Sequence, residues 1–311
     1  MRRDDFLLDR VTVHADCIAH VASWGTMAPD SVPPSIRLLR LWFAVLGRVA
    51  PGLAEEQAVR IFLTPRRREP RDPEVVGRPA QRMFVDRNGS RLAGWSWGDG
   101  PTVMLVHGWS GRAADMSALA TAFVGAGYRA VAFDMPAHGA SSGRRSSLAE
   151  WMEALPVMVE KCGGVHAIVG HSLGAAAVVL ALEAGLRANG AVLFAPPLEP
   201  STFIERILRF IALPAALLPG VNRRLAEHVG RDMTFFDSAR AAATLSLPVL
   251  IFHDPMDQEV PWSHGEAIAR AWPGSVLESP RDVGHFQILK DPALLSQTVE
   301  FVSALTSRTS V

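Results

Sequence analysis

The sequence predicts an α/β fold with a mostly parallel, doubly wound sheet, a helical cap insertion and an N-terminal helical extension. From residue 82 onward, short apolar runs alternate with helical stretches, which is the pattern of successive βα units. The runs are continuously apolar, as in strands buried on both faces of a parallel sheet. One long interval, residues 196–247, contains helical patches but no clear strand. We therefore expect it to form a cap inserted into the sheet domain.

The first two predicted strands, Arg82–Asp86 and Leu92–Trp97, flank an Asn88–Gly89 pair that is typical of the turn in an antiparallel hairpin. The runs that predict buried strands are Thr102–Val106, Ala130–Phe133, Ala167–Val169, Ala191–Phe194 and Val249–Phe252, and a last strand is predicted at Ser275–Glu278. Helices are expected between them, including Ala114–Ala126 and Leu173–Leu186. In such sheets, functional side chains collect at the carboxyl ends of the strands.

The predicted domains are an N-terminal helical extension and linker (1–80), a sheet domain (81–195 and 248–311) and the cap (196–247). Within the extension, a helix carries Arg37, Arg40 and Arg48 on one narrow stripe of an otherwise apolar surface. We expect this helix to dock on the sheet domain or the cap rather than to insert into a membrane. Residues 65–73 combine proline with repeated charge, which predicts a solvated linker.

Composition excludes several classes of protein. Lysine plus arginine equals aspartate plus glutamate, at 31 each, so the chain has no net attraction to nucleic acid or to an anionic membrane. Cys17 and Cys162 are the only cysteines and match no metal-ligand spacing. The N-terminus shows no signal-peptide pattern and no apolar run is long enough to span a bilayer. These observations predict a reduced, cytoplasmic protein.

A serine in a sharp turn carries the strongest functional signal. The motif Gly170-His171-Ser172-Leu173-Gly174 follows the apolar run 167–169 and precedes an alanine-rich helix. Two glycines permit the close approach of strand and helix, and the turn exposes the serine oxygen. The helix dipole and the Leu173 N–H favour negative charge at that point. We therefore predict that Ser172 is a nucleophile and that Leu173 contributes to an oxyanion hole.

With this motif, the sequence resembles the α/β-hydrolase fold family over residues 82 to about 305. In that family a strand ends in His-Gly and the next N–H completes the oxyanion hole. Here the segment Val106-His107-Gly108-Trp109 implies that the backbone of Trp109 is this donor. The segment 134–141, Asp-Met-Pro-Ala-His-Gly-Ala-Ser, is similar to the family's D-x-P-x-H-G-x-S loop, which shapes the site from outside the triad.

A neutral serine needs a general base, and the base needs an acid that orients it. The resemblance implies the chain order serine, acid, histidine. The loop after Val249–Phe252 resembles the family's acid loop, in which an aspartate precedes a valine-proline pair by three residues, and this favours Asp257. Asp254 and Glu259 remain alternatives. The segment 282–286, Asp-Val-Gly-His-Phe, resembles the terminal G-H-F segment and makes His285 the predicted base.

The remaining histidines are predicted to be structural. The resemblance implies that His107 and His138 are scaffolding and that His171 points away from the nucleophile, whereas His253 and the others are expected at the surface or in loops. No histidine pair has a zinc-helix spacing, and no glycine-rich loop has a nucleotide-binding pattern. The sequence therefore implies neither a metal nor another cofactor.

These residues predict a serine hydrolase that cleaves ester-type bonds through an acyl-enzyme, most simply a carboxylesterase acting on a small acyl substrate. The same triad suits a thioesterase, a lactonase, a lipase or an acyltransferase, and the fold also supports metal-free perhydrolase chemistry. A binding protein without activity is a further alternative. An aspartate nucleophile is disfavoured, because the residue in the sharp turn between strand and helix is a serine, Ser172. The sequence leaves open peripheral membrane contact and the choice between monomer and homo-oligomer.

Overall fold

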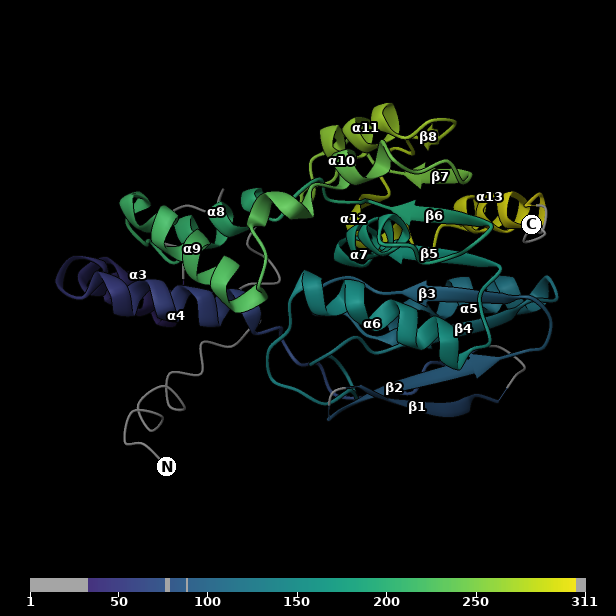
Figure 1. Cartoon of the computed structure of the whole chain (residues 1–311), viewed down its shortest axis with the longest axis horizontal. Coiled ribbons are helices and arrows are strands. Elements are labelled where there is room, and N and C mark those ends of the chain that lie inside the picture. The colour runs from purple at the N-terminus through teal and green to yellow at the C-terminus, as the bar shows by residue number, and fades with distance from the viewer. Residues whose placement is uncertain (1–32, 76–78, 88, 306–311) are drawn as a thin grey trace. The chain divides into compact units, whose positions relative to one another are not determined.

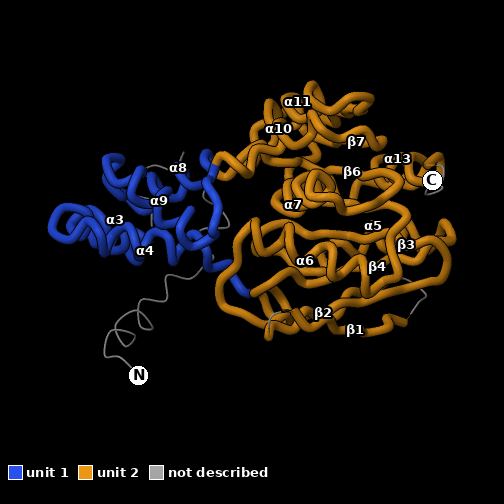
Figure 2. Tube along the Cα trace, in the orientation of Figure 1, with its two compact units in different colours: residues 1–67, 201–233 blue, residues 68–200, 234–311 orange. Residues whose placement is uncertain are grey.

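The structure is a computed structural model that describes residues 33–75, 79–87 and 89–305 (Figure 1). Contacts within the chain divide it into two compact units (Figure 2). The helical unit contains the described residues of 1–67 together with 201–233, and the sheet unit contains those of 68–200 and 234–311.

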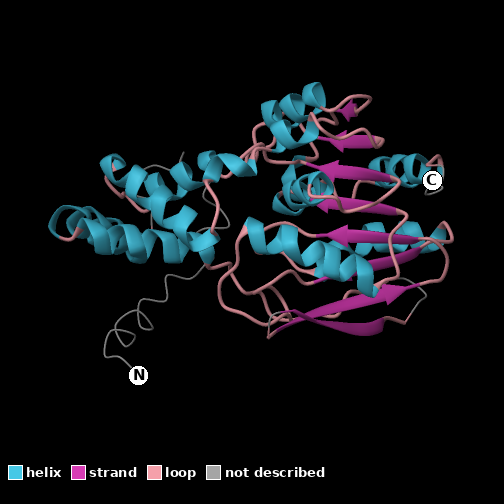
Figure 3. Ribbon diagram, in the orientation of Figure 1, coloured by secondary structure: helices cyan, strands magenta, loops and turns pink. Residues whose placement is uncertain are grey.

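An eight-stranded sheet forms the centre of the sheet unit (Figure 3). Its strands are β1 (Gln81–Arg87), β2 (Ser90–Trp97), β3 (Thr102–Val106), β4 (Arg129–Phe133), β5 (Ala167–His171), β6 (Gly190–Phe194), β7 (Val249–Phe252) and β8 (Val276–Glu278). The spatial order is β1-β2-β4-β3-β5-β6-β7-β8. The β1–β2 and β2–β4 pairs are antiparallel and all other pairs are parallel. The predicted fold class is confirmed.

The sequence explains where the strands lie. Every residue of β3, β5 and β6 is buried, as continuous apolar runs in a parallel sheet require. In the β1–β2 hairpin, Arg87 pairs with Ser90, so only two residues connect the strands. The predicted Asn88–Gly89 turn lies at this connection, although Asn88 is outside the described residues.

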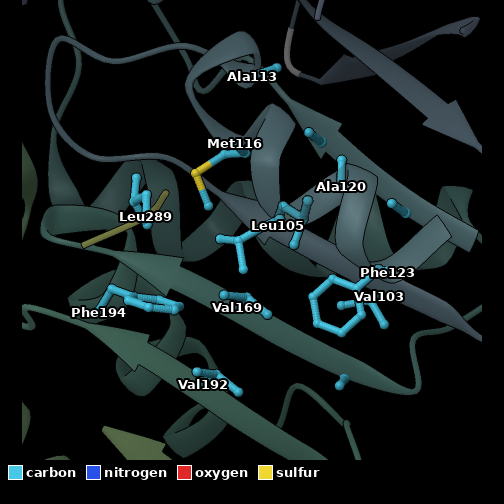
Figure 4. Close-up of a cluster of buried hydrophobic side chains, with 14 of the residues drawn as sticks. Val103, Leu105, Ala113, Met116, Ala120, Phe123, Val169, Val192, Phe194 and Leu289 are labelled. Atoms are coloured by element: carbon cyan, nitrogen blue, oxygen red, sulfur yellow. The ribbon is translucent and has the colours of Figure 1, made fainter. Parts of the chain in front are cut away.

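Helices cover both faces of the sheet (Figure 1). The longer ones are α5 (Ser117–Gly125), α6 (Leu148–Lys161), α7 (Leu173–Glu183), α11 (Trp262–Ala271) and α13 (Pro292–Ser303), and the shorter ones are η3 (Ala113–Met116), α10 (Ser238–Ala242) and α12 (Gly284–Gln287). α6 packs beside α7 on one face, and α5 and α13 pack together on the other. The core under α5 joins Phe123 and Met116 to Leu105, Val169 and Phe194 (Figure 4).

The helical unit contains α3 (Pro34–Val49), α4 (Pro51–Leu63), α8 (Ser201–Phe210), η4 (Ala215–Leu217) and α9 (Leu218–Val229), and η5 (Met233–Phe236) follows α9. One apolar cluster joins all four α-helices: Leu39 and Phe43 from α3, Ala54, Ala58, Val59 and Leu63 from α4, Ile204 and Leu208 from α8, and Val221 and Leu225 from α9. A polar contact supports it, because the Arg224 Nε donates to the largely buried Glu55 carboxylate at 3.0 Å. The N-terminal helices thus pack on cap helices, as the sequence analysis expects of the arginine-bearing helix.

The division into units differs from the predicted domain boundaries. Contacts group 33–67 with 201–233, while 68–75 and 234–247 group with the sheet. The charged segment after Pro65 is anchored, because Arg68 pairs with Asp115 at 2.9 Å and the Trp95 indole donates to Asp72 at 3.1 Å. Val75 is buried in the sheet-unit core. The predicted assignment of an extension and linker (1–80), a sheet domain (81–195 with 248–311) and a cap (196–247) stays a prediction. Within the described ranges, none of the helices has the length and apolar content needed to cross a bilayer.

Candidate active site

The predicted nucleophile lies at the tight junction between β5 and α7. Ser172 has φ 51° and ψ −126°, a conformation that L-residues rarely adopt and that costs roughly 1–3 kcal/mol. Its N–H donates to the Phe194 carbonyl at 2.8 Å, and its carbonyl accepts from the Ala175 N–H at 2.8 Å. Neighbouring structure therefore holds the serine in this strained geometry.

Small residues make the junction sterically feasible. A Cβ at Gly170 would lie 2.6 Å from the Ala175 Cα, and one at Gly174 would lie 2.3 Å from the His107 carbonyl oxygen. Either substitution would force backbone apart, because real Cβ atoms do not approach so closely. The two glycines of the motif thus allow α7 to pack against β5 and the end of β3, as the sequence analysis infers.

The loop after β3 lies against the nucleophile. A Cβ at Gly108 would lie 3.0 Å from the Ser172 Cβ, so the peptide leading to Trp109 is close to the serine. Leu173 is the first residue of α7, and the first N–H groups of a helix have no partner within it. The two predicted oxyanion donors therefore belong to segments that flank the serine. Their role as donors stays a prediction.

Hydrogen bonds from two buried histidines fix this loop. The His107 Nδ1–H donates to the Gly108 carbonyl at 2.7 Å, and the His107 Nε2 accepts from the Met135 N–H at 3.0 Å. The His138 Nε2 accepts from the Ser110 N–H at 3.0 Å, and its Nδ1–H donates to the Pro136 carbonyl at 2.8 Å. Burial lowers the pKa of His107 to about 4, so the ring stays neutral and keeps this pattern at physiological pH. Both rings act as the scaffolding that the resemblance implies.

The segment similar to D-x-P-x-H-G-x-S supports the same loop. The buried Asp134 carboxylate accepts from the N–H groups of Ala113 and Ala140, each at 2.7 Å. Burial raises the pKa of Asp134 to about 6, and these two hydrogen bonds oppose the rise. The Ser141 hydroxyl accepts from the Ala93 N–H at 2.9 Å. This segment therefore ties the loops after β3 and β4 to β2.

The predicted acid and base are in contact. The His285 Nδ1 lies 2.7 Å from the Asp257 Oδ2, and both side chains are buried. The Asp257 Oδ1 also accepts from the N–H groups of Glu259 and Val260. Burial raises the pKa of Asp257, but the hydrogen bond to His285, its charge and these two N–H groups outweigh burial and hold the pKa below its ordinary value. Asp257 is therefore an ionised partner for the imidazole.

Asp254, the alternative acid, has a different set of partners. Its carboxylate accepts from the N–H groups of Met256 at 2.8 Å, Val283 at 2.8 Å and Gly284 at 2.7 Å. It is 1% exposed and connects the acid loop to the turn that precedes His285. Asp254 is thus placed to position the base, and Asp257 is the carboxylate in contact with it. Glu259 is only partly buried, and its backbone N–H donates to the Asp257 carboxylate at 2.7 Å.

His171 has a connecting role that the sequence analysis missed. Its Nε2–H donates to the backbone carbonyl of His285 at 2.9 Å, and the two imidazole centres are 4.7 Å apart. Burial lowers the pKa of His171 to about 3, which keeps the ring neutral. A residue adjacent to the nucleophile therefore holds the loop that carries the base. No local sequence pattern predicts this contact, because it joins residues 114 positions apart.

His253 is a buried loop residue. It is expected at the surface or in a loop, and it lies in the loop directly after β7 with its side chain fully buried. Its Nε2–H donates to the Val260 carbonyl at 3.0 Å and lies 3.7 Å from the Asp257 Oδ2. Gly265 of α11 leaves room for the ring, since a Cβ there would lie 2.4 Å from the His253 Nδ1. Tertiary packing of α11 on the strand end accounts for this burial.

Known proteins of similar sequence or structure share the fold of this chain. A family model described as "Serine aminopeptidase, S33" matches residues 100–246. No curated protein matches the chain. Among solved structures, the esterase Pf2001 of Pyrococcus furiosus is 17% identical, with 78% of this chain and 97% of that chain covered and a TM-score of 0.60.

Two further structures are similar at the same level. The esterase RhEst1 of Rhodococcus sp. ECU1013 is 18% identical over 73% of this chain and 99% of that chain, with a TM-score of 0.55. A bromoperoxidase of Bacillus anthracis is 16% identical over 72% and 99%, also with a TM-score of 0.55. At these identities the similarity establishes the fold. The chain therefore has the α/β-hydrolase fold.

Proposed function

We propose that this protein is a serine hydrolase that cleaves carboxylic ester bonds through an acyl-enzyme, as a carboxylesterase. The observation that carries the proposal is the strained serine at the end of β5 in one unit with a buried histidine–aspartate pair of 2.7 Å. A structural serine gains nothing from a conformation of this kind, whereas a nucleophile gains an exposed and fixed oxygen. The esterases among the similar structures support the ester class.

The proposed mechanism follows from the direction of the hydrogen bonds. In the neutral imidazole whose Nδ1–H donates to Asp257, the Nε2 of His285 carries no proton and is the nitrogen that takes the serine proton. Ser172 Oγ attacks the ester carbonyl, and the protonated His285 then gives its proton to the departing alcohol. Water attacks the acyl-enzyme in a second step, with His285 again as the base. Asp257 stays ionised and stabilises the imidazolium.

The oxyanion that forms in each step needs two N–H donors. The backbone groups of Trp109 and Leu173 are the proposed pair, and each donor contributes about 3 kcal/mol to transition-state stabilisation. The hydrogen bonds of His107 and His138 hold the first of these segments before substrate arrives. The hole is therefore pre-organised rather than assembled during the reaction.

Two exposed apolar side chains next to the acid and the base indicate the substrate class. Met256 precedes Asp257 and is 59% exposed, and Phe286 follows His285 and is 56% exposed. The Phe286 ring stands edge-on to His285, with ring centres 5.0 Å apart. An apolar border of this kind favours esters of aliphatic acids over charged substrates.

Hydrolysis of p-nitrophenyl acetate, butyrate and octanoate by the full chain tests the proposal. We expect Ser172→Ala to reduce kcat/KM by at least about 10⁴-fold, while Ser296→Ala, at an exposed serine of α13, leaves it unchanged. If Ser172→Ala stays within tenfold of the parent, the nucleophile assignment is wrong. Release of p-nitrophenol that depends on an added alcohol and yields the alcohol's ester in place of free acid would instead identify an acyltransferase, and peracid formation from acetate and peroxide would identify a perhydrolase.

A further inference from the structure

The outer face of α3 exposes a continuous apolar stripe. Leu38, Leu41, Trp42, Val45 and Val49 recur at helical spacings of three and four and are between 39% and 73% exposed. The opposite face contains Ile36, Leu39, Phe43 and Gly47, which are buried. α3 therefore has two apolar faces, and among the described residues only the inner one packs on the other helices of the unit.

A basic stripe borders the exposed apolar one. Arg37, Arg40 and Arg48 are exposed and lie between the inner and outer faces, on one side of the helix. α3 contains no aspartate or glutamate. Arginine side chains at this position can extend their apolar stems along a lipid surface and leave the guanidinium groups among the headgroups.

Charge is also unevenly distributed over the chain. The described residues of the helical unit, 33–67 and 201–233, contain eleven arginines and five carboxylates, a formal charge of +6, although the whole chain is neutral. One carboxylate, Glu55, is already paired with Arg224 inside the unit. The helical unit is therefore attractive to an anionic surface in a way that the total charge of the chain conceals.

A second copy of the same face is a poor partner. A twofold interface through α3 places identical surfaces against each other. The arginines of one copy would then lie near the same arginines of the other, with no carboxylate on either α3 to pair with them. An anionic bilayer instead offers an apolar layer to the leucine, valine and tryptophan side chains and negative headgroups to the arginines. Tryptophan is also enriched at the lipid–water boundary of membrane proteins.

From these observations we propose that α3 lies flat in the headgroup region of an anionic phospholipid membrane and attaches the protein peripherally. This inference goes beyond the proposed esterase activity and does not depend on it. It also qualifies the expectation that the helix only docks within the protein, because docking uses the inner face and leaves the outer face available.

Vesicle flotation with the full chain tests the proposal. We expect the protein to float with phosphatidylcholine vesicles that contain half phosphatidylglycerol, and to float much less with pure phosphatidylcholine. Raising the salt from 0.1 M to 0.5 M should weaken binding, since it shortens the Debye length. Arg40→Gln should lower the partition coefficient roughly fivefold, the share of one basic residue near a charged surface.

Leu41→Glu combined with Val45→Glu should abolish flotation while leaving ester turnover unchanged. Phe84→Glu is the matched control, because Phe84 is a 45% exposed apolar residue on β1 of the other unit. Flotation that survives the double substitution, or that Phe84→Glu removes equally, would overturn the proposal.

The other occupants of the face give distinct results. A wild-type dimer that becomes monomeric in the double variant, without flotation of either, would assign the face to a second copy. A photo-crosslinking residue in place of Leu41 that captures residues 1–32 in a non-floating monomer would assign it to that segment. Either result rejects the membrane proposal.

Discussion

Asp254→Asn is the substitution that best separates positioning from catalysis at this site. The carboxylate accepts three backbone N–H groups, of which Val283 and Gly284 belong to the turn before His285. An amide keeps one acceptor oxygen and turns a donor toward the remaining N–H groups. Hydrogen bonds to a charged group contribute about 1.5–3 kcal/mol each. We therefore expect the free energy of unfolding to fall by about 2–3 kcal/mol and the Tm by about 5–8 °C.

The same substitution should slow turnover without removing any catalytic group. A shift of about 1 Å in the turn that carries the base lowers kcat by roughly 10²-fold. Asp257→Asn should act differently, with a loss near 10⁴-fold, because the amide neither stabilises the imidazolium nor fixes the reactive tautomer. Asp282→Asn is the matched control: it makes the same change at an exposed position in the same turn, where Asn tolerates the positive φ of 62°.

Calorimetry and steady-state hydrolysis of p-nitrophenyl butyrate give both quantities for all three variants. Unchanged Tm and kcat in Asp254→Asn would refute the proposal that Asp254 positions the turn before His285. A greater loss of kcat at Asp254 than at Asp257, with a normal Tm, would show that the acid is Asp254 and reverse the assignment.

Three further predictions concern strain, pH and the N-terminal helices. Ser172→Gly should be more stable than Ser172→Ala by about 1–2 kcal/mol in chemical denaturation, because glycine relieves the strained backbone; equal stabilities would contradict the strain. The neutral His107 and His171 have lowered pKa values in the folded state, so the stability they contribute is complete above pH 6.5 and is lost as pH falls toward 4. At pH 5 each histidine lowers the free energy of unfolding by about 2 kcal/mol, and the raised pKa of Asp134 offsets about 1 kcal/mol of this loss. In calorimetry, His171→Gln should therefore reduce the slope of stability against pH. Deleting residues 1–80 should give aggregated protein in size-exclusion chromatography, since it uncovers Ile204, Leu208, Val221 and Leu225; a soluble monomer would contradict this packing.

Local pattern was sufficient to predict the sheet. The strands β3 to β7 coincide with continuous apolar runs to within two residues at each end, because burial on both faces demands such runs. The nucleophile turn was also predictable, since its spacing of glycines has a direct steric cause at Gly170 and Gly174. The start of α6 has a local signature too, the Ser147–Glu150 capping box.

Long-range contacts could not be predicted in this way. The bonds from Asp254 to Val283 and from His171 to His285 span 29 and 114 residues, and neither has a local signature. The grouping of α3 and α4 with α8 and α9 could not be predicted either. An apolar face indicates that a helix packs on another element, but it does not identify that element. The sequence also did not indicate which apolar face of α3 is exposed, because the helix is apolar around most of its circumference.

The most direct test of the central claim, that Ser172 is an activated nucleophile, is covalent labelling with a fluorophosphonate. Intact mass spectrometry of the full chain should show one adduct per chain, and peptide mapping should place it on Ser172. Ser172→Ala should take up no label, and His285→Ala should react far more slowly, because the base that activates the serine is gone. A folded chain that remains unlabelled, or that carries the adduct on another residue, would contradict the account.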